Sequence, residues 1–147
     1  MIKNNPYFSY LGCFFPQEIP SEKLRAIDRK PLSRLIDVPH LTLQFNPWSI
    51  DVSLFGTEIA VTMLGYGCDG ENEGVLVKAH SENPQIQSII DAVPVPHITL
   101  SVSSDGKPVN TARLSFSPIE PVMIKGVFGG YTWDGKTVIE SSYNARM

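Results

Sequence analysis

One eight-residue segment occurs twice in this chain, at 38–45 and at 95–102. The two copies read VPHLTLQF and VPHITLSV, so five of the eight positions are identical. Both copies alternate polar and apolar residues, which is the pattern of a strand with one buried face. Because successive strand side chains point to opposite faces, each copy should bury its apolar residues and present a histidine and a threonine together on the other face.

The polar face of the repeat carries most of the chain's histidine. The chain has three histidines, and two of them, His40 and His97, stand at the same position of the two copies. Thr42 and Thr99 follow at the same offset, so each threonine shares a face with its histidine. Threonine also favours strands for packing reasons alone, and the shared offset is what marks both threonines as candidate site residues.

Composition restricts the class of protein and its partners. A length of 147 residues and an apolar content of 42% predict one globular domain, 1–147. The net charge of −3 argues against a surface that holds a DNA duplex. Cys13 and Cys68 lack metal-ligand spacing and suggest reduced thiols. With no signal peptide and no membrane-spanning segment, we expect a cytoplasmic monomer that does not bind a membrane.

The remaining pattern predicts strands and two helices. Strands are expected at 7–15, 57–66, 75–79, 121–128 and 137–140. The second and third of these should form a hairpin across the Gly- and Asp-rich turn at 67–74.

One helix should begin at Ser21, with Glu22 in its first turn. The other should begin after the Asn83 cap with Pro84 at its first position, and it carries an apolar stripe at Ile86, Ile89 and Ile90.

The order of these elements is β-α-β-β-β-α-β-β-β, with a helix before each histidine-bearing strand. This order predicts an α+β fold of two related, interleaved lobes. We expect mostly antiparallel sheets around a central groove, with the helices outside and the two motifs facing the groove.

Paired histidines with paired threonines suit phosphoryl transfer. One imidazole can take a proton from the attacking hydroxyl or water while the other protonates the departing oxygen, and both titrate near neutrality. The threonines can donate hydrogen bonds to non-bridging phosphate oxygens. The scheme needs neither a metal nor a cofactor, and the sequence shows no carboxylate–histidine cluster that would suggest a metal site.

The segments His40-Leu41-Thr42-Leu43 and His97-Ile98-Thr99-Leu100 resemble the paired motifs of the two-histidine (2H) phosphoesterase superfamily. That group includes the LigT-like RNA 2′,3′-cyclic phosphodiesterases, viral 2′,5′-phosphodiesterases and phage enzymes that degrade cyclic oligonucleotide messengers. The resemblance implies a bilobal α+β fold and metal-independent chemistry at a cyclic or 2′-linked phosphate. The expected substrate is a small nucleotide, a short oligonucleotide or an RNA end.

Several aromatic residues are candidates for stacking on a nucleobase. These are Tyr10, Phe128, Tyr131 and Trp133. Packing in the core is the alternative for such residues, because aromatic side chains dominate protein cores. Lys125 is a candidate phosphate contact, with a solvated lysine at a strand edge as its alternative.

Several questions stay open at the level of sequence. The chain could be a non-catalytic module that binds a nucleotide or an RNA end. The repeat could also be a duplication whose two strands only pack against each other. His80 lies in a polar segment beside Glu82 and is expected to be an ordinary surface residue. The sequence does not select among a 2′,3′-cyclic phosphate, a 2′,5′ linkage, a cyclic oligonucleotide and an ADP-ribose-type cyclic phosphate, nor does it say which histidine is the base.

Overall fold

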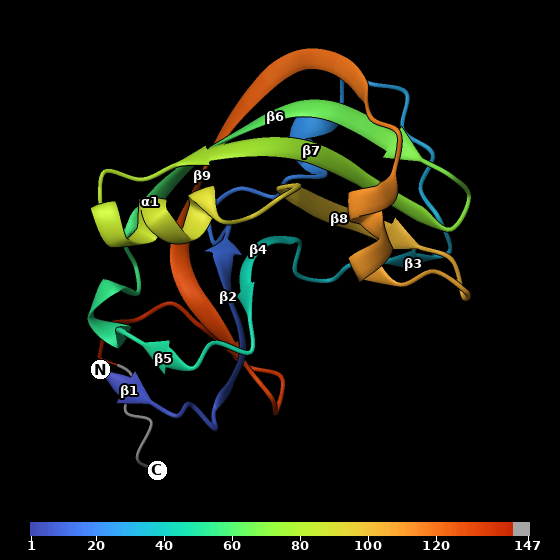
Figure 1. The fold of residues 1–147 in the computed structure, drawn as a ribbon. Coiled ribbons are helices and arrows are strands. Elements are labelled where there is room, and N and C mark those ends of the chain that lie inside the picture. Colours follow the sequence, from blue (N-terminus) through green and yellow to red (C-terminus); the bar gives the residue numbers. More distant parts are fainter. Residues whose placement is uncertain (143–147) are drawn as a thin grey trace.

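The protein is described by a computed structural model that covers residues 1–142, and strands dominate it (Figure 1). The main sheet contains β2 (Phe8–Phe14), β3 (Arg34–Leu35), β4 (His40–Phe45), β6 (Glu58–Cys68), β7 (Asn72–His80), β8 (His97–Val102), β9 (Ser117–Thr132) and β10 (Thr137–Val138). A separate antiparallel pair is formed by β1 (Ile2–Lys3) and β5 (Ser49–Ile50).

Six of these strands close into an antiparallel barrel. Their order is β9-β2-β4-β8-β7-β6, and β6 pairs again with β9. The closing strand is β9, drawn in orange to red in Figure 1, which curves from beside β6 to beside β2. Val127 marks the change of partner, because it pairs with Glu58 of β6 on one side and with Phe14 of β2 on the other. Closure leaves these six strands without a free edge.

The barrel interior is filled by the apolar face of each strand. On β6, Ile59, Val61 and Met63 are fully buried, while the residues between them are partly accessible. The motif strands follow the same alternation, with Leu41 and Ile98 in the core. The hairpin predicted from 57–66 and 75–79 is confirmed as β6 and β7, which are joined through Gly70 at φ 89°. This left-handed conformation favours glycine.

Helical structure is sparse. The single α-helix among residues 1–142 is α1 (Pro84–Asp91), and 3₁₀ turns lie at η1 (Glu22–Leu24), η2 (Val52–Leu54) and η3 (Pro108–Arg113). The predicted start of α1 is confirmed, because the Asn83 side chain accepts from the backbone N–H groups of Gln85 and Ile86. No helix in the described part of the chain is long and apolar enough to cross a membrane.

The expectation of a bilobal α+β fold with helices outside is wrong. Strands account for 44% of the chain and helices for 14%, and the sheet closes into one barrel. The helix expected from Ser21 is only the short turn η1. After this turn the chain does not continue as a helix, and two of its backbone amides bond to barrel side chains. The N–H of Lys30 donates to the Tyr66 hydroxyl, and that of Leu32 to the Ser101 hydroxyl.

The C-terminal expectations are confirmed in outline. The strand expected at 121–128 lies within the much longer β9. The segment expected at 137–140 begins with β10, which pairs with Gly130 and Tyr131 of β9 across a turn at Gly135.

Candidate functional site

The two repeated motifs lie on neighbouring strands. Leu41 of β4 pairs with Ile98 of β8 in an antiparallel arrangement, and both side chains point into the core. The residues on either side of this pair face outward. Because the two strands are antiparallel, His40 lies beside Thr99 and Thr42 lies beside His97. The two motifs are therefore related by an approximate twofold rotation.

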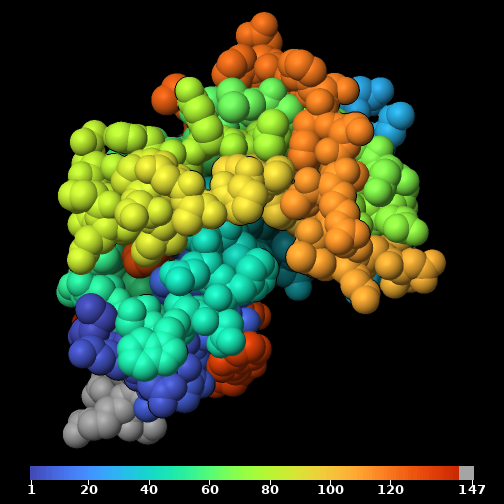
Figure 2. Space-filling model, viewed as in Figure 1, coloured from blue at the N-terminus to red at the C-terminus, as the bar shows by residue number. Residues whose placement is uncertain are grey.

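All four motif residues line one cavity of about 520 Å³. This volume falls within the range of about 300–1,000 Å³ that is typical of small-molecule sites. The cavity lies on the outer face of the barrel, where the segment between α1 and β8, the turn η3 and strand β4 meet. Figure 2 shows the surface hollowed between these yellow, orange and teal segments. The expectation that both motifs face one groove therefore agrees with the geometry, although the groove does not separate two lobes.

The walls of the cavity are mostly apolar. Tyr10 and Phe45 contribute from β2 and β4, and Ile36 from the segment before β4. The other lining residues are Leu43, Ala92, Val93, Pro94, Val95, Pro108, Val109 and Ala112. Such walls can cover the face of a base or a ribose, while the histidines and threonines supply polar contacts.

Each catalytic candidate histidine is held by a backbone carbonyl two residues earlier. Nδ1 of His40 lies 2.9 Å from the oxygen of Val38, and Nδ1 of His97 lies 2.7 Å from the oxygen of Val95. Because a carbonyl only accepts, each Nδ1 carries a proton, which leaves Nε2 as the ring nitrogen available to the cavity. These two carbonyls were not predicted, although the Val-Pro pair before both histidines was visible in the sequence.

The surroundings of His40 favour its neutral form. Burial lowers the pKa of His40, the hydrogen bond to Val38 opposes this shift, and the nearby charge of His97 lowers the pKa further. Neutral imidazole is the form that accepts a proton. His40 is thus suited to the role of general base.

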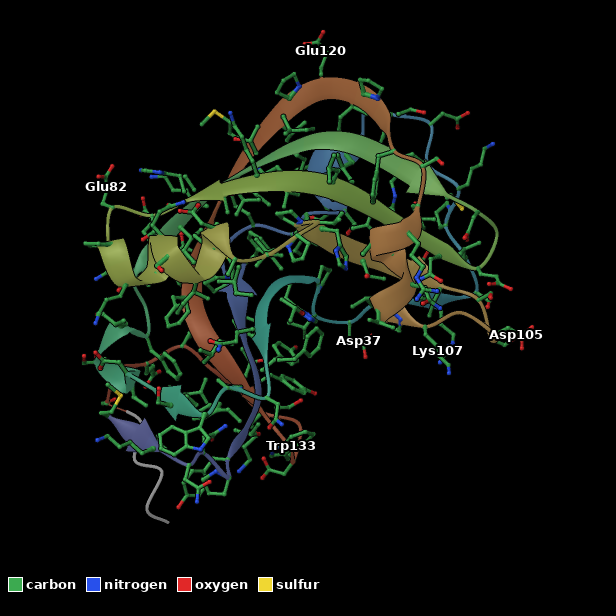
Figure 3. All side chains as sticks on the ribbon, viewed as in Figure 1. Asp37, Glu82, Asp105, Lys107, Glu120 and Trp133 are labelled. Carbon is green, nitrogen blue, oxygen red and sulfur yellow. The ribbon has the colours of Figure 1, made fainter. Side chains whose placement is uncertain are left out.

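The four candidate aromatic residues have different positions in the structure. Tyr10 lines the cavity and stacks on His40, with ring centroids 4.9 Å apart. Tyr131 lies behind it, with its ring 5.2 Å from that of Tyr10. Phe128 is buried in the barrel core at 1% exposure, which matches the core-packing alternative. Trp133 is 64% exposed and lies outside the cavity lining, in the lower part of the view in Figure 3.

The two threonines have different surroundings. Thr42 is half-buried and lines the cavity. Thr99 also lines it but is 8% exposed, and its hydroxyl lies 2.8 Å from Oγ1 of Thr111 and 3.2 Å from the oxygen of Pro108. Thr111, on η3, was not among the residues predicted from sequence, because nothing in the repeat points to it.

The other candidate residues do not line the cavity. His80 is exposed and lies 3.4 Å from Glu82, as expected for a surface residue. Lys125 is exposed beside Glu58, at 3.9 Å. Burial raises the pKa of Cys13, which keeps it a thiol. Residues 1–142 contain no group of three or more His, Cys, Asp or Glu side chains that could hold a metal ion.

Comparison with known proteins does not assign the chain to a family. No protein-family model matches it, and no curated protein matches it. The functional argument therefore depends on the cavity and on the chemistry of the residues that line it.

Proposed function

We propose that this protein is a phosphodiesterase that hydrolyses or transesterifies a cyclic or 2′-linked nucleotide phosphate without a metal ion. The observation that carries the proposal is the convergence of both His-x-Thr motifs on one cavity, each with Nδ1 held by a carbonyl. The likeness to the two-histidine phosphoesterases lies in these motifs, and the closed barrel plays no part in it.

In this proposal His40 is the base. Its Nε2 accepts the proton of a water molecule or hydroxyl as that oxygen attacks phosphorus. Protonated His97 donates the proton of its Nε2 to the ribose oxygen whose bond to phosphorus breaks. The hydroxyls of Thr42 and Thr99 donate to the non-bridging oxygens, where negative charge grows in the transition state. The two imidazoles end in exchanged protonation states and are reset by exchange with water.

The mostly apolar walls suit the rest of a nucleotide. Val93, Pro94 and Val95 line the cavity from the segment before β8, and Val109 and Ala112 line it from η3. These side chains offer no hydrogen-bonding pattern that would select one base. We therefore expect the four bases to be accepted with similar kcat/KM.

A substrate panel in EDTA tests the proposal. It contains 2′,3′-cyclic mononucleotides, short RNA with a cyclic end, 2′,5′-oligoadenylate and cyclic oligonucleotides. Wild type is compared with His40→Ala and His97→Ala, and His80→Ala is the matched control because this third histidine is exposed and does not line the cavity. We expect turnover of at least one class by wild type and His80→Ala, and loss in the other two variants.

The alternative function is binding without chemistry. It is favoured by the mostly apolar lining, which would hold a nucleotide whether or not the histidines react. Absence of turnover across the panel, with nucleotide binding that survives both histidine substitutions, would establish this alternative and contradict the phosphodiesterase.

A further inference from the structure

A buried chain of hydrogen bonds leads from strand β7 to the hydroxyl of Thr99. Asn72, at the start of β7, and Thr111, on η3, are 1% and 0% exposed. The side-chain amide of Asn72 donates to Oγ1 of Thr111 over 3.0 Å and to the carbonyl of Lys107 over 2.6 Å. Oγ1 of Thr111 lies 2.8 Å from Oγ1 of Thr99. The cavity-lining threonine of β8 is therefore supported from behind by two residues outside the motif.

The direction of this chain follows from its ends. The carbonyl of Lys107 only accepts, so the group facing it is the NH₂ of Asn72, and its second hydrogen is available to Thr111. Either hydroxyl of the Thr111–Thr99 pair can donate to the other. If Thr111 donates to Thr99, the proton of Thr99 is left for the carbonyl of Pro108, at 3.2 Å, or for an oxygen in the cavity. In this arrangement the side-chain hydrogens of the Asn72 amide and of both threonine hydroxyls each have an acceptor.

The backbone is shaped to let Thr111 approach. A Cβ on Gly74 would lie 2.3 Å from Cγ2 of Thr111 and 2.7 Å from the carbonyl oxygen of Ile98. Gly74 is the partner of Thr99 in the pairing of β7 with β8, next to a register shift that follows Glu73. The absence of a side chain at this position thus allows η3 to pack directly behind Thr99.

The other motif has no such support. Within residues 1–142, no hydrogen bond joins the hydroxyl of Thr42 to another group of the protein, although Thr42 lines the same cavity. A hydroxyl that accepts a hydrogen bond becomes a better donor, because chains of hydrogen bonds polarise one another. The two motifs are alike in sequence, but the described part of the protein fixes the orientation of the Thr99 hydroxyl by hydrogen bonds and not that of the Thr42 hydroxyl.

We propose that Thr111, held by Asn72, is a positioning residue that directs the Thr99 hydroxyl toward the phosphate, and that Thr99 is the stronger of the two threonine donors. This inference rests on the proposed phosphodiesterase function. The competing explanation is that Thr111 only packs η3 against β8. The two explanations differ in which part of the Thr111 side chain matters, the hydroxyl or the methyl group.

Kinetics of Thr111 variants distinguish the positioning role of Thr111 from a packing role. Thr111→Val keeps the shape and removes the hydroxyl, and we expect kcat to fall about tenfold with KM nearly unchanged, less than the about 10²–10³-fold loss on removing an oxyanion donor itself. Thr111→Ser keeps the hydroxyl and removes the methyl group, and should retain most of kcat. A packing role would make the serine variant at least as defective as the valine variant.

A double-mutant comparison shows whether Thr111 acts through Thr99. In a Thr99→Val background, Thr111→Val should cause no further loss of kcat, because its target is gone. In the matched Thr42→Val background it should still cause about the tenfold loss seen in wild type. Asn72→Ala tests the chain one step further back and should also lower kcat, which keeps the proposal testable if Thr111→Val fails to fold.

The outcomes separate this proposal from the proposed function. Equal kcat for Thr111→Val, Asn72→Ala and wild type would overturn the positioning role and leave the phosphodiesterase standing. Equal losses for Thr111→Val in the Thr99→Val and Thr42→Val backgrounds would do the same. A wild-type protein with no turnover on the whole substrate panel would overturn both.

Discussion

The phenol ring of Tyr10 lies nearly parallel to the imidazole of His40, with centroids 4.9 Å apart and planes inclined by 18°. The ring of Phe14 lies 5.8 Å from the same imidazole. These rings cover part of the half-buried His40 imidazole and contribute to the burial that lowers its pKa. It is the reason why we assign the role of base to His40 in the proposed reaction.

The lowered pKa of His40 predicts the position of the acid limb of the pH profile. The base must be neutral, so kcat/KM should rise with pH through the pKa of His40, below the ordinary value of about 6.5. The measurement is kcat/KM between about pH 4.5 and about pH 9. An acid limb centred above the ordinary histidine value would contradict the assignment of His40 as base.

Removal of the stacked ring should move that limb. Tyr10→Ala lets water reach His40, which weakens the desolvation that lowers its pKa, so the acid limb should shift to higher pH. Tyr10→Phe keeps the ring and is the matched control, and its acid limb should remain at the wild-type position. The same pH titration of kcat/KM measures both variants. Identical acid limbs in wild type and Tyr10→Ala would show that the ring does not set this pKa.

The buried ion pair of Arg29 and Glu73 should contribute to stability. The guanidinium donates to both oxygens of Glu73, over 2.9 and 2.8 Å, and the hydroxyls of Tyr66 and Ser101 donate to the same carboxylate. Arg29→Met leaves the fully buried carboxylate without its cation, and we expect it to lower the free energy of unfolding by about 3 kcal/mol. Glu73→Gln should cost less, because the charge left behind, on Arg29, is partly exposed at 18%. Urea unfolding measures both, and an effect of Arg29→Met no larger than that of Glu73→Gln would contradict this ranking.

The same pair predicts a dependence of stability on pH. Burial opposes ionisation of Glu73, but the hydrogen bonds from Arg29, Tyr66 and Ser101 outweigh it, and the pKa of Glu73 is lowered. A lowered carboxyl pKa gives stability that is fully present above the unfolded value, about 4.3, and lost as pH falls through the folded pKa. The difference in unfolding free energy between wild type and Glu73→Gln should therefore be constant near neutrality and shrink in acid. A difference that grows in acid would contradict the sign of this shift.

Salt should have little effect on turnover of a mononucleotide. None of the cavity-lining residues in the described part of the chain is a lysine or an arginine. Proteins that make 6–10 phosphate contacts lose about 10³–10⁵ in affinity between about 50 and about 200 mM salt, because bound counterions are released. Here kcat/KM should change less than about twofold over that range. A steep decrease would show that basic side chains outside the cavity lining hold the substrate.

Local sequence patterns were sufficient for several elements. The Asn83-Pro84 start of α1 and the hairpin of β6 and β7 depend on residues that are near each other in the chain. Caps, turns and alternation express local backbone preferences, so they can be recognised without the fold. The first helix was predicted by the same reasoning and was wrong. The amides of Lys30 and Leu32 bond to barrel side chains from β6 and β8, a preference that no local pattern contains.

By itself, the sequence determined that His40 and Thr42 share one strand face, and that His97 and Thr99 share another, because strand side chains alternate. Only the tertiary structure decided that these two faces are neighbours. Pairing of β4 with β8, and closure of the barrel through β9, join segments far apart in the chain. Such pairing is selected by burial of the whole apolar interior and not by adjacent residues. Packing of η3 against β7 and β8 placed Thr111 behind Thr99. The closed barrel placed Phe128 in the core, although the sequence alone was also compatible with a base-stacking role for this residue.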